Sequence, residues 1–109
     1  MNRTTGIALL SLALIASPAS AAEPEFVLTL RNHRFEPPEL RVPAGQKVKL
    51  VVHNQDSAAE EFESHELNRE KVIAAGGSGT IYVGPLAPGR YPFFGEFNDS
   101  TARGVLVAE

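Results

Sequence analysis

The sequence predicts an all-β protein, a Greek-key β-sandwich of about seven to eight short strands. Short segments rich in β-forming residues alternate with glycine and proline, and none has the apolar spacing of a helix of about ten residues. Residues 46–54 (QKVKLVVHN) alternate apolar and polar side chains, as a strand with one buried face does. A proline–glycine turn followed by a tyrosine, in residues 86–91 (LAPGRY), is typical of such sandwiches.

The predicted strands cover most of the chain after residue 25. Val48, Leu50 and Val52 share the face that we expect to be buried, because successive strand residues point to opposite faces. Residues 64–71 (SHELNREK) are compatible with a single helical turn. The expected strands are 26–30, 39–45, 46–54, 80–84, 90–94 and 104–108, with a half-buried strand around Phe62.

The segment 86–91 predicts a specific local structure where the chain crosses between sheets. Pro88 and Gly89 suit the two central positions of a type II turn. Tyr91 follows two residues later, where its hydroxyl can bond to the backbone of the crossing loop. We therefore expect a tyrosine corner, as in other Greek-key sandwiches.

Residues 1–22 have the layout of a secretory signal peptide. Arg3 provides the basic start, residues 6–16 form the apolar run, and small residues allow cleavage after Ala21 or Ala22. The apolar run is about half of the ~20 residues that a membrane span needs. We therefore expect an exported domain of residues 23–109, periplasmic or secreted, without direct insertion into the membrane.

The composition of the exported part argues against several partners and ligands. Removing Arg3 leaves nine basic against 13 acidic side chains, a net charge of −4, which argues against nucleic acid and anionic lipid. The chain has no cysteine, and its one methionine is Met1, so no sulfur ligand remains for a soft metal. Any metal must therefore bind to carboxylate, imidazole, amide or backbone atoms.

Three segments carry a family resemblance: residues 35–56 (FEPPELRVPAGQKVKLVVHNQD), 84–97 (GPLAPGRYPFFGEF) and 104–109 (GVLVAE). Together they resemble the cupredoxins, and more narrowly the small exported cupredoxin-like proteins, related to EfeO-type domains, that accompany bacterial iron-uptake systems. The resemblance covers the mature chain from Glu25 to Glu109. It implies the cupredoxin sandwich and a role beside an iron-uptake system.

The same comparison indicates which copper ligands are missing. Type 1 copper sites use two histidines, a cysteine and a weak axial ligand, usually methionine. Gly95 stands about where the cysteine would be, Asn98 about where the second histidine would be, and Thr101 or Ala102 near the methionine. We therefore expect that the chain is not a blue-copper electron carrier.

An acidic stretch, residues 60–70 (EEFESHELNRE), takes the place of the first histidine and contains five glutamates. If Phe62 points into the core, Glu61, Glu63 and His65 share the outer face. If the strand is bulged instead, Glu63 joins the rim and Glu61 is solvated. In a cupredoxin sandwich the loop 95–99 (GEFND) approaches this strand, so carboxylates and an imidazole could converge on iron or Cu(II). The candidate metal ligands are Glu61, Glu63, His65, Glu96 and Asp99.

The acidic stretch also has an interpretation without a metal. Charged residues on an edge strand discourage pairing with another chain. Arg69, Lys71 and Arg103 could neutralise the glutamates as ion pairs. A metal site instead requires the carboxylates to lie within about 5 Å of a common point, since ligands lie about 2.0–2.3 Å from a metal.

Other polar and aromatic residues receive structural roles. We expect His33 at the surface of a strand-joining turn and His53 facing outward. Asn54 and Asp56 should shape the following turn through side-chain to backbone bonds. The candidates for packing in the core and at its rim are Phe35, Phe93, Phe94 and Phe97.

Two functions remain open from the sequence. The first is a periplasmic metal-handling accessory that binds iron or Cu(II) and serves an inner-membrane iron permease or another periplasmic component, with assisted oxidation of Fe(II) as a variant. The second is a metal-free interaction module that docks on a membrane protein through its acidic rim. No catalytic constellation is evident, because Ser64 and His65 are adjacent and would point to opposite faces of a strand.

Overall fold

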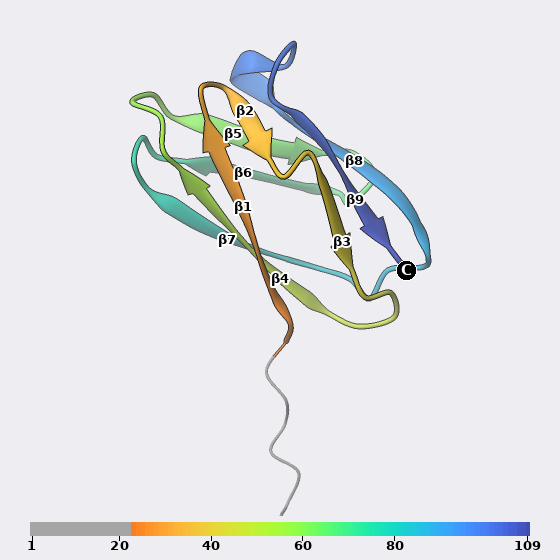
Figure 1. Ribbon diagram of the computed structural model, residues 1–109. Helices are drawn as coiled ribbons and strands as arrows, with labels where there is room; N and C mark the ends of the chain where they lie inside the picture. Colours follow the sequence, from red (N-terminus) through yellow and green to blue (C-terminus); the bar gives the residue numbers. More distant parts are fainter. Residues whose placement is uncertain (1–22) are drawn as a thin grey trace, which may run out of the picture.

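The computed structural model describes residues 23–109 and confirms the all-β sandwich (Figure 1). The predicted signal peptide, residues 1–22, lies outside the described residues. Within residues 23–109, no helix is long and apolar enough to cross a membrane. The elements are β1 (Glu25–Arg31), β2 (Arg34–Glu36), β3 (Glu39–Val42), β4 (Val48–Asn54), β5 (Glu60–Ser64), β6 (Arg69–Ile73), β7 (Ser78–Val83), β8 (Gly89–Gly95), the 3₁₀ turn η1 (Glu96–Asn98) and β9 (Arg103–Ala108).

Two sheets pack face to face around one core. The first has four strands in the order β2-β1-β4-β7, and the second has five in the order β3-β9-β8-β5-β6. The pairs β1–β4 and β3–β9 are parallel, and the other pairs are antiparallel. Because the connections β2–β3, β3–β4, β4–β5, β6–β7 and β7–β8 each cross between the two sheets, neighbours along the chain often face each other across the core.

Two strands were not predicted from the sequence, and one of them corrects an expectation. The predicted helical turn over 64–71 is wrong: residues 65–68 form a turn, and β6 returns along β5 as a hairpin. Asn68 has a φ of 55°, a left-handed conformation that asparagine tolerates at turns. The other unpredicted strand, β2, has only three residues, which is too short for an alternation pattern to reveal.

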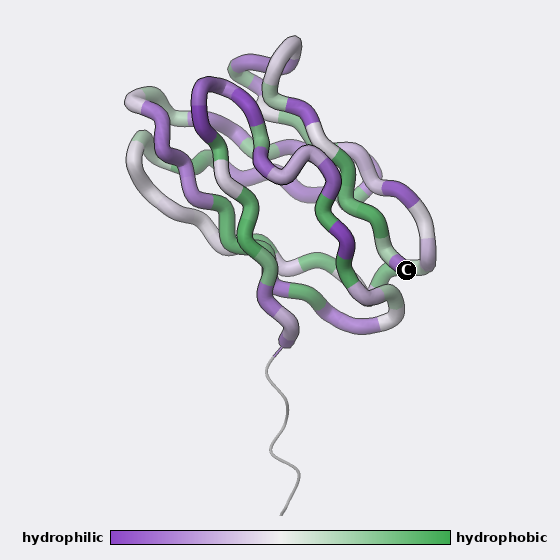
Figure 2. Tube along the Cα trace, in the orientation of Figure 1, coloured by the Kyte–Doolittle hydropathy of each residue, from purple (hydrophilic) through white to green (hydrophobic). Residues whose placement is uncertain are grey.

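The core contains aliphatic residues of both sheets and an aromatic cluster. Phe62 stacks on Phe93 with ring centroids 5.2 Å apart, and Phe35 meets Phe93 edge-on at 5.2 Å. Apolar and polar residues alternate along the strands, as a two-layer sandwich requires (Figure 2). Phe35 and Phe93 are therefore core residues as predicted, whereas Phe94 is half-buried and Phe97 is 56% exposed.

The tyrosine corner is present, but the turn before it differs from the prediction. The Tyr91 hydroxyl donates a hydrogen bond of 2.8 Å to the Ala87 carbonyl, which confirms the expected bond to the crossing loop. Gly89 is not among the residues with positive φ and already belongs to β8. The predicted type II turn at Pro88–Gly89 is therefore wrong, because it requires a positive φ at the glycine.

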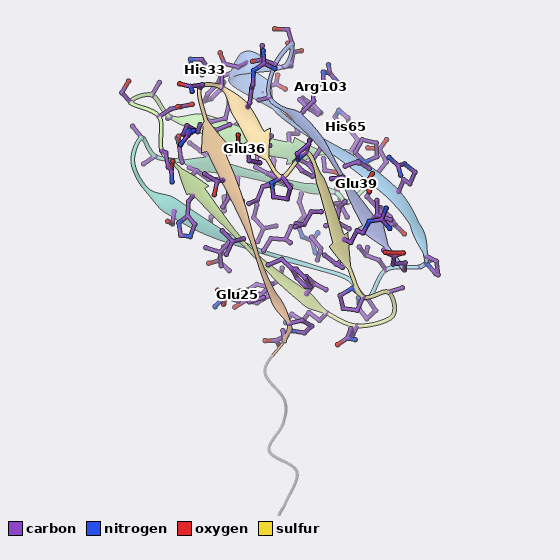
Figure 3. All side chains as sticks on the ribbon, in the orientation of Figure 1. Glu25, His33, Glu36, Glu39, His65 and Arg103 are labelled. Carbon is purple, nitrogen blue, oxygen red and sulfur yellow. The ribbon has the colours of Figure 1, made fainter. Side chains whose placement is uncertain are left out.

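The turn after β4 is built as predicted, by side-chain to backbone bonds. Asn54 Nδ2 donates to the Ala58 and Ile73 carbonyls at 2.9 and 3.2 Å. The Asp56 carboxylate accepts the backbone N–H groups of Asn32 and His33 at 2.7 and 2.9 Å. These bonds connect the β4–β5 turn to the β1–β2 turn, where the His33 side chain is exposed (Figure 3).

Candidate functional site

The side chains of strand β5 point alternately to the inner and outer faces of the sheet. Glu60, Phe62 and Ser64 are buried, whereas Glu61 and Glu63 are half-exposed on the opposite face. This confirms the expectation that Phe62 points into the core. The acidic stretch therefore supplies two different environments, one inside the sandwich and one outside it.

Glu60 lies inside the sandwich and was not among the predicted site residues. It is 2% exposed. Its Oε1 accepts hydrogen bonds from the backbone N–H groups of Glu61 and Phe97, at 2.9 and 2.8 Å. Its Oε2 accepts a hydrogen bond from Asn98 Nδ2 at 2.7 Å. Within residues 23–109 no basic side chain forms an ion pair with it. Glu60 is thus a buried carboxylate held by three hydrogen bonds and no positive charge.

Gly95 explains how this carboxylate fits. A Cβ placed on Gly95 would lie 2.7 Å from Glu60 Cδ, 2.8 Å from Glu60 Oε2 and 2.8 Å from Ala102 Cβ. The Glu60 carboxylate therefore occupies the space into which a side chain at position 95 would point.

Asn98 has a defined structural role at the same place. Its amide donates to Glu60, and its carbonyl accepts the backbone N–H groups of Thr101 and Ala102 at 3.1 and 2.8 Å. Gly95 N–H in turn donates to the Ala102 carbonyl at 2.8 Å. These bonds close the segment from β8 to β9 into a compact loop, with η1 at its start (Figure 1).

The outer face of the five-stranded sheet carries a row of side chains across four strands. The register pairs Glu70 with Glu63, Glu63 with Phe94, and Phe94 with Arg103. Two glutamates thus lie directly opposite each other, an arrangement that destabilises a sheet unless a positive group joins them. His65 lies over the same area, with its ring centroid 5.7 Å from that of Phe94.

Glu63 is the member of this row whose ionisation is altered. Desolvation at the sheet surface raises its pKa above the ordinary value. A hydrogen bond with Glu96 and the negative charges of Glu96 and Glu61 raise this pKa further, whereas His65 lowers it. Glu63 therefore keeps its proton to a higher pH than an isolated glutamate does.

The basic side chains proposed as counter-charges do not form ion pairs with these glutamates in residues 23–109. Arg69 instead donates to the Tyr82 and Asn68 carbonyls at 2.9 and 2.8 Å. The Arg103 guanidinium lies 5.8 Å from the centroid of the Phe94 ring (Figure 3). The negative charge of the outer face is therefore not compensated by contacts within 4 Å.

The five predicted metal ligands are brought together only in part. Glu61, His65 and Glu96 lie close enough to affect the charge state of Glu63, whereas Asp99, at the end of η1, is not among the groups that do so. In the described part of the chain, no group of three or more His, Cys, Asp or Glu side chains has the spacing to hold a metal ion. The donors of these five residues are oxygen and nitrogen, which are the ligands that hard cations prefer.

A shallow polar hollow adjoins this face, at the turn between β5 and β6. Its volume is about 530 Å³ and it is open to solvent. The residues that line it are Glu63, Ser64, His65, Asn68, Arg69 and Glu70.

Related sequences place the chain in a family. The model of the cupredoxin-like domain matches residues 5–108. An uncharacterized protein of Rickettsia prowazekii (strain Madrid E) is 42% identical over 83 residues, which are 76% of this chain and 66% of that protein. The chain thus spans slightly less than two thirds of the length of this relative.

Solved structures with the same fold include copper proteins. Auracyanin A, a "blue" copper protein of Chloroflexus aurantiacus, superposes with a TM-score of 0.69 at 14% identity, over 81% of this chain and 100% of that one. The auracyanin of Roseiflexus castenholzii gives a TM-score of 0.65 at 18% identity, over 82% and 99%. At these identities the likeness concerns the fold alone. The family match over residues 5–108 shows that the chain belongs to the cupredoxin-like domain family.

Proposed function

We propose that this chain is a periplasmic cupredoxin-like accessory that carries a hard metal cation, iron or Cu(II), in support of iron uptake. The metal is its cargo, passed to an inner-membrane permease or another periplasmic component. The link to iron comes from the family resemblance, and the export from the expected signal peptide. The preference for a hard cation comes from the oxygen and nitrogen donors of the acidic stretch.

The observation that carries this proposal is the environment of Glu60. Buried charges in proteins are normally paired with an opposite charge or bound to a metal, because their desolvation is costly. Glu60 is 2% exposed, and among residues 23–109 no basic side chain pairs with it. A carboxylate offers about four acceptor positions. Three are used here, two on Oε1 and one on Oε2, and all three are filled by uncharged donors.

The outer carboxylates offer a second set of oxygen donors, on the opposite face of β5. The nearby Glu96 and Glu61 raise the pKa of Glu63, so Glu63 holds its proton to a higher pH than an isolated glutamate does. A metal ion arriving at this face would displace the proton, so binding should strengthen as the pH rises. His65 and Asp99 are the remaining candidate ligands on this side, and water or the receiving protein would complete the coordination.

The test is an anaerobic titration of the mature domain with Fe(II), Cu(II), Zn(II) and Mn(II), following stoichiometry and affinity by calorimetry. It uses wild type, Glu60→Gln, a double variant Glu61→Gln/Glu63→Gln, and a matched double variant Glu25→Gln/Glu36→Gln on the four-stranded sheet. Circular dichroism checks that each variant is folded. We expect one equivalent to bind to wild type and to the matched control, and to be weakened at least tenfold in the other two.

A metal-free interaction module remains the second candidate, and a specific observation favours it. The three donors around Glu60 and the close approach of Gly95 already fill this part of the interior. If every metal binds weakly and equally to all variants, the carrier proposal is wrong. The acidic face would then be assigned to a protein partner.

A further inference from the structure

We propose that Phe97 is the aromatic anchor of a docking surface for a protein whose apolar pocket is flanked by basic side chains. Phe97 lies in η1 and is 56% exposed. An exposed phenylalanine alone is ordinary on a protein surface. Phe97 differs from such residues because its turn is held from inside the protein and because charged side chains surround it.

The turn that carries Phe97 is fixed from inside the core. The Phe97 backbone N–H donates to Glu60 Oε1 at 2.8 Å, and the next side chain, Asn98, donates to Glu60 Oε2 at 2.7 Å. Ala102, which closes the loop through its bonds to Asn98 and Gly95, is fully buried. The backbone on both sides of Phe97 is thus anchored while its ring points to solvent.

The other large exposed apolar side chains lack this combination. Val27, Val72 and Tyr82 lie along strands β1, β6 and β7, and the Tyr82 ring is covered by Lys47 at 4.8 Å. Phe97 alone among them sits on a turn held by a buried carboxylate. An aromatic side chain on a fixed backbone loses little entropy on binding, and such residues are frequent binding hot spots.

The charges around Phe97 define the chemistry of the partner. Glu96 precedes it and Asp99 follows it in the same turn, while Glu61 and Glu63 lie on the adjacent β5. In residues 23–109 no ion pair within 4 Å neutralises any of these four carboxylates. Complementarity therefore favours lysines and arginines around the receiving pocket. The same charges disfavour a second copy of this chain and an anionic membrane.

This inference does not depend on metal binding, because it needs only the fixed turn, the exposed ring and the charges. The test places a photo-crosslinking phenylalanine analogue at position 97 of the full chain in its host cells, and at Val72 as a control. Crosslinked proteins are identified by mass spectrometry. Binding of the purified partner is then measured with wild type, Phe97→Ala, Phe97→Leu, Glu96→Gln/Asp99→Asn and Val72→Ala.

We expect one dominant protein crosslinked at position 97 and not at position 72. Phe97→Ala should weaken its binding at least tenfold, Phe97→Leu less, and Val72→Ala less than twofold. The charge variant should lower the association rate and its salt dependence. Less than a twofold effect of Phe97→Ala, or equal crosslinking at both positions, would overturn the proposal.

Binding to lipid vesicles tests the alternative that this surface docks on a membrane. If phosphatidylcholine vesicles, with or without phosphatidylglycerol, bind wild type and not Phe97→Ala, the surface belongs to a membrane and the protein partner is rejected. Titration of Phe97→Ala with the metals above keeps the two proposals distinct. The loss of docking should leave metal binding within twofold of wild type.

Discussion

Glu60 and Glu61 are identical, adjacent residues in opposite environments. Glu60 lies inside the sandwich, where two backbone N–H groups and the Asn98 amide bind its carboxylate. Glu61 lies on the outer face, where its charge contributes to a raised pKa of Glu63. The inner carboxylate organises the loop that follows β8, whereas the outer carboxylates repel one another.

This difference shows that a dense acidic segment is not one functional unit. The alternation of the strand places some of its side chains in the core, where they stabilise the fold, and others on the outer face, where they contribute charge. The inner half must be satisfied by hydrogen bonds, because an unsatisfied buried group is costly. The outer carboxylates can remain without a counter-charge, because water screens their charge. They are then available to a cation or to a basic partner.

The largest effect on stability should follow the removal of the inner carboxylate. Glu60→Ala leaves two backbone N–H groups and the Asn98 amide without their acceptor and opens a cavity. We expect the free energy of unfolding in urea to fall by about 3 kcal/mol or more. Glu61→Ala, the outer control, should change it by less than about 0.5 kcal/mol. Equal losses for the two variants would remove the distinction between the faces.

The next effect concerns the space that Glu60 fills. Gly95→Ala places a Cβ 2.7 Å from Glu60 Cδ, which forces the carboxylate or the loop to move. The expected loss is about 2 kcal/mol in the same unfolding measurement. Gly89→Ala in the same strand is the control, because its nearest neighbour would lie 3.8 Å away. A neutral Gly95→Ala would indicate that the carboxylate is not packed against this glycine.

Asp56 provides an intermediate case, a partly exposed carboxylate that also binds two backbone N–H groups. It accepts the N–H groups of Asn32 and His33, whose φ angles are 53° and 57°. Asp56→Ala should cost about 1 kcal/mol, since water can reach the freed groups. Asp56→Asn keeps one acceptor and should lose less. A loss of stability as large as that of Glu60→Ala would show that the cost of removing a carboxylate does not depend on its burial.

The smallest effect is the pH dependence of the outer face. Because the pKa of Glu63 is raised, the folded chain holds this proton more tightly than the unfolded chain does. The resulting stabilisation is complete below the ordinary pKa of 4.5 and is lost as the pH rises through the raised value. Glu63→Gln should therefore gain stability relative to wild type as the pH rises above 4.5. Glu66→Gln, in the exposed turn, is the matched control, and a similar trend there would contradict the assignment.

Much of the fold could be predicted from local patterns. The alternation in β4, the apolar Phe62 in β5 and the tyrosine of the LAPGRY segment each correspond to observed features. Strand β6 was missed because four of its five residues are exposed, so its sequence lacks the alternation of apolar and polar residues that indicates a strand. The turn before Tyr91 was also misread, since Pro88–Gly89 is a common turn sequence that here leads directly into β8.

The sequence by itself determined the sandwich, because strand alternation repeats every two residues and needs no distant contacts. It predicted the outward direction of Glu61 and Glu63 on the condition that Phe62 is buried and the strand is regular. Only the tertiary structure decided which groups satisfy the inward-facing carboxylate of Glu60. Its partners, Phe97 and Asn98, are 37 and 38 residues away and meet it only through the register of β5 with β8. A one-residue shift in that register would turn a different side chain toward Gly95, and local sequence carries no signal for that choice.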